Sequence, residues 1–191
     1  MSNSKKTMII ILILLLTVIW FLSLSGALSD LFGKSNSCGG TINNTNPFAS
    51  KKIKSDKIVY FHTKFFLEPK DEYEEEHEKA RGYIFEVKTD KDGKILLSED
   101  YYDPVSCETD EAIFSKLQKI IEEHDLVKMN GVSNYTQGLP PEFSPAFLEA
   151  VYDSGEKLNF CFDNNPYDDW SRDIMHLLMD ELADCGVIEL P

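Results

Sequence analysis

The sequence predicts an α+β domain that follows an N-terminal transmembrane helix. Three observations carry this prediction. Residues 8–28 form one uncharged apolar run, several later segments alternate apolar and polar residues, and two segments repeat apolar residues every three or four positions. Alternation is typical of strands, and the longer spacing is typical of helices. Their order (β-β-β-α-β-β-α) favours one antiparallel sheet of about five strands with both helices packed on one face.

The apolar run over residues 8–28 has the length of a helix that spans a bilayer, about 30 Å at the standard helical rise. Lys5 and Lys6 precede it. Positive charge beside an apolar span stays on the cytoplasmic side, so we expect residues 1–7 in the cytoplasm and the rest of the chain outside. The sequence therefore predicts a single-pass protein of the cell membrane with an extracytoplasmic C-terminal domain, held in the lipid bilayer by its N-terminal helix.

A cleaved signal peptide is the alternative interpretation of the same run. Small residues would allow cleavage after Ala27 or after Ser29, and the protein would then be secreted. The run is at the upper length limit for a signal peptide, which favours a retained anchor. A lipoprotein anchor is excluded because Cys38 lies well beyond the apolar run and lacks the required preceding residues.

Composition divides the rest of the chain in two. Residues 29–56 are rich in Ser, Asn, Gly, Thr and Lys without apolar periodicity, which predicts a flexible linker. Residues 57–191 are long enough for one compact domain. The chain after Leu28 has 17 basic and 33 acidic residues, a net charge of −16. Such a charge excludes nucleic acid as a partner and favours basic protein surfaces.

The strands are predicted from alternation and turn signals. Ile58–Leu67 is dense in β-branched and aromatic residues, and residues 83–89 and 94–100 flank an Asp-Gly turn typical of a hairpin. Residues 146–152 and 157–162 predict a second hairpin. Residues 187–191 are either a short edge strand or a frayed end.

Two helices are predicted from apolar stripes. The first runs from about Thr109 to His124, with acidic residues suited to its first turn. The second follows Pro166 and ends at Gly186, a residue typical of helix C-termini. The stripes comprise Ile113, Phe114, Leu117, Ile120 and Ile121 in the first helix, and Trp170, Ile174, Leu177, Leu178 and Leu182 in the second.

Three short pieces follow one another in the second half: Leu126, Met129 and Gly131, then Gly155-Glu156-Lys157-Leu158, then Asn164-Asn165-Pro166. Their order resembles the signature of a domain common in exported and membrane-anchored proteins of Gram-positive bacteria. The resemblance covers roughly residues 58–184, with Met129 where the family usually has tryptophan. The family has no established activity, so the resemblance implies compartment and fold and no catalytic residue.

The four cysteines, Cys38, Cys107, Cys161 and Cys185, suit an exported protein, where an even number permits disulfides. Three pairings are open. Cys161 and Cys185 lie in neighbouring predicted elements, so this pair is the first expectation if any bridge forms. No spacing typical of a zinc site occurs.

No segment carries a recognisable catalytic, cofactor-binding or metal-binding motif. The acidic run at residues 71–78 lacks the turn glycine of a calcium loop and is interpreted as a solvated charge run. The four histidines are scattered without ligand spacing. We therefore assign no catalytic, cofactor-binding or metal-ligating residue, and no cofactor.

Two hypotheses of function remain. The preferred one is an acidic binding module without catalytic activity, tethered to the membrane, that contacts another envelope protein, a basic peptide or a wall polymer. The alternative is a hydrolase or metal-dependent enzyme with its site near Asp163–Asp169 and the long loop Asn130–Pro145. Long loops often carry recognition or catalysis, which makes the Asn130–Pro145 loop the candidate surface in both.

Overall fold

Alternating burial along the central strands sets the layers of the domain. In β2 (Ile58–Leu67), Phe61, Thr63 and Phe65 are buried, whereas the residues between them are half-buried. Successive side chains of a strand point to opposite faces, so in the centre of the sheet one face is covered and the other is partly open to solvent. The structure, a computed structural model, describes residues 39–70, 80–101 and 104–188 of the 191-residue chain.

The described residues form one eight-stranded sheet. Its spatial order is β1-β6-β8-β7-β2-β3-β4-β5, and every neighbouring pair is antiparallel except β6 and β8. The other strands are β1 (Thr41–Asn43), β3 (Arg81–Thr89), β4 (Ile95–Glu99), β5 (Val105–Thr109), β6 (Ser133–Thr136), β7 (Ala146–Tyr152) and β8 (Lys157–Phe162).

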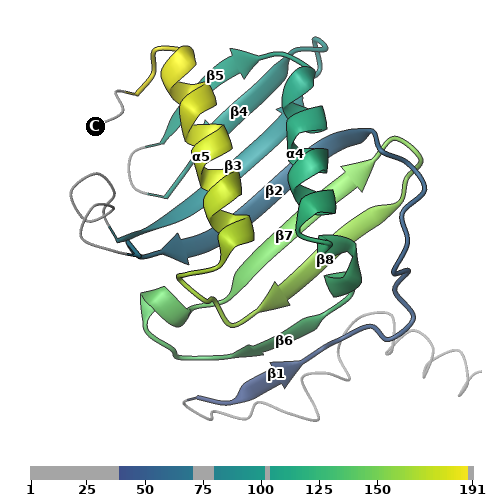
Figure 1. The fold of residues 1–191 in the computed structure, drawn as a ribbon, viewed down its shortest axis with the longest axis vertical. Coiled ribbons are helices and arrows are strands. Elements are labelled where there is room, and N and C mark those ends of the chain that lie inside the picture. Colours follow the sequence, from purple (N-terminus) through teal and green to yellow (C-terminus); the bar gives the residue numbers. More distant parts are fainter. Residues whose placement is uncertain (1–38, 71–79, 102–103, 189–191) are drawn as a thin grey trace, which may run out of the picture. The chain divides into compact units, whose positions relative to one another are not determined.

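Two helices cover one face of this sheet, α4 (Ala112–Glu123) and α5 (Asp169–Asp184), as Figure 1 shows. The Asp110 carboxylate accepts a hydrogen bond from the Ala112 N–H at 2.7 Å, which satisfies a free donor at the start of α4. Short 3₁₀ helices follow α4 (η1, Leu126–Met129) and precede β7 (η2, Pro141–Phe143).

The core lies between the helices and the sheet. The Trp170 ring of α5 meets Phe65 of β2 and Phe160 of β8 edge-on, at centroid distances of 5.8 and 5.6 Å. The predicted apolar stripes of both helices supply eight further core residues and the strands supply most of the others, whereas Leu177 is only partly buried. The α+β class and the placement of both helices on one face are therefore confirmed.

The predicted number of strands is wrong. We expected about five antiparallel strands, and β1, β5 and β6 are additional. All three are short: β1 and β6 are mainly polar and lack the apolar alternation that identifies β2, β7 and β8, and β5 alternates over only five residues. The parallel pairing of β6 with β8 also makes the sheet mixed rather than purely antiparallel.

The predicted linker over residues 29–56 also needs correction. Residues 41–43 form β1, which pairs with β6 in the register Thr41↔Thr136 to Asn43↔Asn134. Residues 44–55 then lie against the domain, where Glu156 accepts hydrogen bonds from the N–H groups of Lys54 and Ser55. Residues 39–56 are thus part of the folded domain.

The structure forms a disulfide between Cys107 of β5 and Cys185, which follows α5. The expected pair Cys161–Cys185 is wrong, and Cys161 is a free, half-buried thiol. Cys107 lies in a strand that we did not predict, and this strand brings its Cα within 6.2 Å of the Cys185 Cα, a usual separation for a disulfide. Cys38 lies outside the described residues.

Several other predictions fall outside the described residues. These are the predicted cytoplasmic residues 1–7, the predicted transmembrane run 8–28, the acidic run 71–78 and the chain end after residue 188. Within the part that is described, no helix is long and apolar enough to cross a membrane. Residues 187 and 188 form no strand.

Candidate binding surface

The β1 end of the sheet is built from two uncharged segments. Residues 39–50 and 129–141 contain 25 residues and no Asp, Glu, Lys or Arg, although 27% of the whole chain is charged. They meet because β1 pairs with β6 and because residues 44–50 cross over the start of β6. We call these two segments the uncharged edge.

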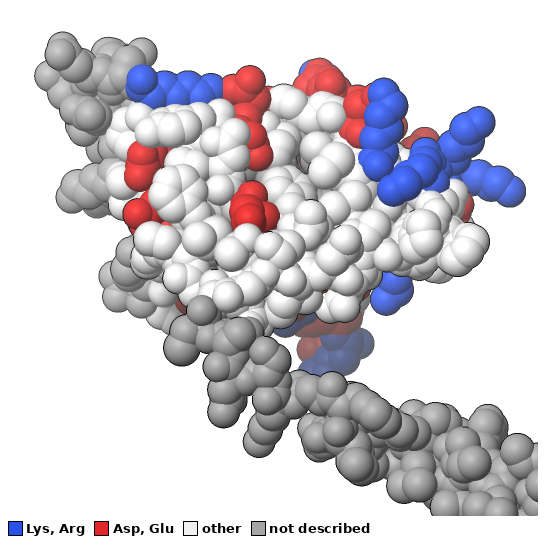
Figure 2. Space-filling model, turned by 90° about the horizontal axis from the view of Figure 1, so that it is seen from below, with Lys and Arg blue, Asp and Glu red and all other residues white. Residues whose placement is uncertain are grey.

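Figure 2 shows this side of the molecule. Uncharged side chains cover most of it, with a few acidic groups among them and most of the visible lysines gathered at one side. Phe48 is 93% exposed and Phe143 is 44% exposed, so two aromatic rings stand in solvent on or beside the uncharged edge. Exposed aromatic side chains surrounded by polar residues are typical of interaction surfaces.

Main-chain hydrogen bonds attach the first segment to the second. The Asn44 N–H donates to the Ser133 carbonyl at 2.7 Å, the Asn46 N–H donates to the Gly131 carbonyl at 2.8 Å, and the Gln137 N–H donates to the Gly40 carbonyl at 3.0 Å. These bonds span the whole width of the uncharged edge. The edge is therefore a continuous surface of the domain.

Asn130 ties this surface to the sheet. Its side chain is buried and donates to the carbonyls of Ser50 and Lys157 at 2.8 and 3.0 Å, while its Oδ1 accepts from the Asn159 N–H at 2.8 Å. The Asn130 carbonyl also accepts from the Lys51 ammonium group. One amide thus joins β8 to the segment that follows β1.

Gly131 makes the close approach possible. Its φ is +78°, a conformation that L-residues rarely adopt, and a Cβ built there would lie 2.3 Å from the Ala49 Cβ and 2.8 Å from the Asn46 carbonyl oxygen. Any larger residue at position 131 would push residues 46–49 away from β6.

Replacement of Gly131 by alanine is expected to destabilise the domain by about 2 kcal/mol, because it adds left-handed strain to a steric clash. The loss should concentrate in residues 44–50, whose amide hydrogens should exchange faster. Gly93 offers a matched control, since its φ is +83° and a Cβ there meets nothing within 4 Å. Equal destabilisation by Gly131→Ala and Gly93→Ala would show that the clash with residues 46–49 is absent.

The two segments of the alternative enzyme hypothesis do converge. The Thr136 N–H and hydroxyl donate to the two oxygens of Asp163 at 2.6 and 2.9 Å. Asn164 is buried, donates to the Glu142 carbonyl at 2.7 Å, and exchanges two hydrogen bonds with the main chain of Phe66. The region around 163–169 therefore fixes the loop that carries Phe143.

The carboxylates of this region are placed for structural roles. Asp163 and Asp169 are exposed, and Asp168 accepts from the Trp170 indole N–H at 3.1 Å. The ion pair with Lys70 holds the pKa of Asp169 below its ordinary value. Within the described ranges, no three His, Cys, Asp or Glu residues gather as metal ligands.

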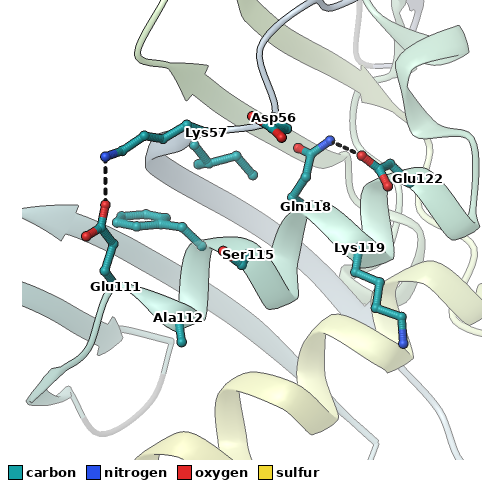
Figure 3. A pocket seen from close by; sticks show the side chains of 10 residues that line it. Asp56, Lys57, Glu111, Ala112, Ser115, Gln118, Lys119 and Glu122 are labelled. Carbon is teal, nitrogen blue, oxygen red and sulfur yellow. Dashed lines mark hydrogen bonds and ion pairs between the residues drawn. The ribbon is translucent and has the colours of Figure 1, made fainter.

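A separate groove of about 600 Å³ lies between α4 and the segment that enters β2 (Figure 3). Ile58 and Phe114 contribute apolar surface, and Lys57 pairs with Glu111 at 2.8 Å. Gln118 donates to Glu122 at 2.8 Å, so the polar groups of the groove are largely occupied with one another.

Tyr152 lies beneath this groove, and its hydroxyl donates to Gln118 Oε1 at 3.1 Å. Burial first, and then Glu122 and Glu156, raise the pKa of Tyr152 to about 12. Burial and Glu86 likewise raise the pKa of Tyr60 to about 12. A tyrosine in an unfolded chain has a pKa near 10. Between pH 10 and pH 12 the unfolded chain therefore releases tyrosine protons that the folded domain keeps.

The contribution of these two tyrosines to the free energy of unfolding is therefore expected to be fully present and independent of pH below about pH 10, and to be lost as the pH rises towards 12. Tyr152→Phe should reduce this alkaline loss by roughly 2 kcal/mol at most. Urea denaturation of both proteins across this pH range measures the effect. An identical pH slope in the wild type and in Tyr152→Phe would contradict it.

The remaining candidate groups lie apart from one another. His124 contacts Asp173 at 2.7 Å on the helix face, whereas His62 lies on β2 against the Phe147 ring. Burial raises the pKa of the Cys161 thiol, which disfavours the reactive thiolate.

The sequence singled out the loop 130–145 as a candidate surface but did not point to residues 39–50, although their lack of charged residues is visible in the sequence.

Comparison with known proteins gives no assignment: the chain matches no family model and no curated protein. The resemblance to an exported Gram-positive domain therefore stays a prediction.

Proposed function

We propose that this protein is a binding module without catalytic activity, tethered to the cell membrane with its domain outside the cytoplasm, and that the uncharged edge is its recognition surface. One observation carries the proposal. A chain with a net charge of −16 after Leu28 keeps 25 residues free of charge on one edge and exposes Phe48 there. Charge elsewhere maintains solubility, so its absence from one contiguous edge favours contact with a partner.

The cysteines support the proposed compartment. Disulfides persist in extracytoplasmic environments and are rare in reducing cytoplasm. Cys107 and Cys185 are 78 residues apart in sequence and are bonded in the fold. Together with Lys5, Lys6 and the apolar run 8–28, this pairing supports export of the domain.

Binding is favoured over hydrolysis because of what the polar groups do. Asp163, Asn164 and Asp168 all hold main-chain or indole groups of the domain. Neither the groove at α4 nor the hollow of about 500 Å³ beside residues 44–53 is lined by residues 163–169. An acid-base site would instead require such carboxylates in a sheltered pocket.

Site-specific photo-crosslinking of the full chain in its own membrane tests the proposal. A photoreactive phenylalanine analogue replaces Phe48 in one variant, Phe143 in a second and Lys119 on α4 in a third. Lys119 is a matched control because its side chain is 74% exposed but lies on the helix face. We expect adducts of one common mass from positions 48 and 143 and none of that mass from position 119.

Two results would contradict the proposal. One is the absence of any adduct from positions 48 and 143 while the variants remain folded. The other is an equal yield of the same adduct from position 119, which would indicate contact without a preferred surface.

A further inference from the structure

The two edge strands of the sheet differ in how they are protected. An edge strand exposes unpaired main-chain groups, and proteins usually blunt such edges with proline, charge or a covering element. At one end of the sheet, Pro104 precedes β5, Glu108 of β5 pairs with Lys94, and Cys107 is bonded to Cys185. The proline, the ion pair and the disulfide all hinder the addition of another strand to β5.

β1, at the opposite end, has none of these devices. Residues 39–46 contain no proline and no charge, and Thr41 and Asn43 are exposed. Pro47 lies beyond the strand. Among the described strands, β1 is therefore the edge that is open to pairing.

The register of β1 shows which main-chain groups are available. Gly40 and Asn44 both bond to the β6 side, through Gln137 and Ser133. Antiparallel pairing alternates between residues that bond to a given neighbour and residues that face away from it. The N–H and C=O groups of Thr41 and Asn43 therefore point away from β6, towards the free edge.

We propose that β1 binds an extended segment of another protein by strand addition, with Thr41 and Asn43 forming the main-chain hydrogen bonds. This inference rests on the proposed binding function and specifies its mode. Strand addition obtains affinity from main-chain hydrogen bonds and specificity from alternate side chains. Phe48 and the half-buried Tyr135 of β6 lie on the same uncharged edge as contacts for those side chains.

Charge selects the partner. The middle of the added segment lies against an uncharged surface, so it should itself be uncharged. Lys51 and Lys52 lie beside this surface, but the net charge of −16 after Leu28 outweighs them and attracts positive flanks. A second copy of this chain would bring a second domain with the same net negative charge close to the first, and the two domains would repel each other. The occupant is thus a segment of a different protein with an uncharged centre and basic ends.

A synthetic peptide tests the mode directly. The probe is the capped heptapeptide Lys-Thr-Val-Thr-Val-Thr-Lys, titrated against the full chain in lipid nanodiscs. Thr41→Pro removes one outward donor and should weaken binding about fivefold, whereas Thr41→Val keeps the donor and should change the affinity less than about twofold. A peptide with N-methylated alternate amides should lose at least about tenfold in affinity, since several hydrogen bonds fail together.

A peptide with Glu in place of both Lys should bind more weakly than the probe at low salt, and the difference should shrink as salt is added. The strand-addition proposal is overturned by equal affinities of the methylated and unmethylated peptides, by no effect of Thr41→Pro, or by equal binding of the Lys and Glu peptides. Dimerisation of the full chain that Thr41→Pro abolishes would also overturn it, in favour of a second copy.

The crosslinking experiment separates this inference from the proposed function. If Thr41→Pro leaves the adduct from position 48 unchanged in yield, the uncharged edge still binds a partner, but not by strand addition. If no adduct forms at all, the proposed function itself fails.

Discussion

Removal of the disulfide between Cys107 and Cys185 is expected to lower the free energy of unfolding by about 4 kcal/mol, because the bond closes a loop of 78 residues in the unfolded chain. It also joins the outermost strand β5 to the residue that follows α5. The unfolded chain gains freedom when the bond is absent, and the folded domain loses the attachment of its edge. A destabilisation of this size is a large fraction of the stability of an ordinary domain.

Urea denaturation of the double variant Cys107→Ser/Cys185→Ser, compared with the wild type without reductant, measures this loss. Cys161→Ser is the control, because Cys161 is a free thiol and its replacement should cost less than about 1 kcal/mol. Adding a reductant should destabilise the wild type towards the double variant and leave the double variant unchanged. A wild type whose stability is insensitive to reductant, or a larger loss from Cys161→Ser, would contradict this pairing.

Replacement of Asn130 by alanine is expected to cost about 3 kcal/mol. The side chain bonds three main-chain groups, those of Ser50, Lys157 and Asn159, and it is 6% exposed. Removing one amide leaves these groups without that partner, and a buried polar group without a partner costs about 1 to 3 kcal/mol. The segment that follows β1 should then detach before the rest of the domain unfolds.

Asn44→Ala provides the matched control for Asn130→Ala. Asn44 lies on the same uncharged edge, but its side chain is exposed, so its loss should change the stability by less than about 0.5 kcal/mol. Thermal or urea denaturation compares the two variants, and limited proteolysis after Lys51 and Lys52 reports the detachment. Equal stability of Asn130→Ala and Asn44→Ala would contradict the role assigned to Asn130.

The central part of the fold is predictable from the sequence because burial imposes a periodic pattern there. The predicted bounds of three strands, residues 58–67, 146–152 and 157–162, agree with β2, β7 and β8. These strands lie in the middle of the sheet, where one face meets the helices and must be apolar. The stripe of α4 is likewise confirmed, since all five of its predicted apolar residues are buried.

The uncharged edge could not be predicted in the same way. β1 and β6 consist mainly of Asn, Thr, Ser and Tyr, a composition typical of loops, and they have little apolar surface of their own. They are strands because β8 offers hydrogen-bond partners to β6 and β6 offers them to β1, and these partners become adjacent only when the chain has folded. A segment that depends on such distant partners resembles a flexible linker in sequence.

The disulfide was predicted wrongly for a related reason. Proximity of Cys161 and Cys185 in sequence suggested a pair, but Cys161 lies on β8, near the middle of the sheet, and Cys185 follows the end of α5. Cys107 reaches Cys185 only through β5, whose order in the sheet depends on the meander from β2. Which cysteines form a disulfide depends on their positions in the folded domain. The spacing of four cysteines along the sequence does not specify those positions.

Amide hydrogen exchange along residues 39–50 tests the central claim most directly, because it distinguishes an ordered sheet edge from a flexible linker. The claim predicts an alternating pattern in the free protein. The N–H groups of Ile42 and Asn44, which face β6, should exchange slowly, whereas those of Thr41 and Asn43 should exchange fast. Uniformly fast exchange from residue 39 to residue 50 would contradict it and would remove the surface on which the proposed function rests.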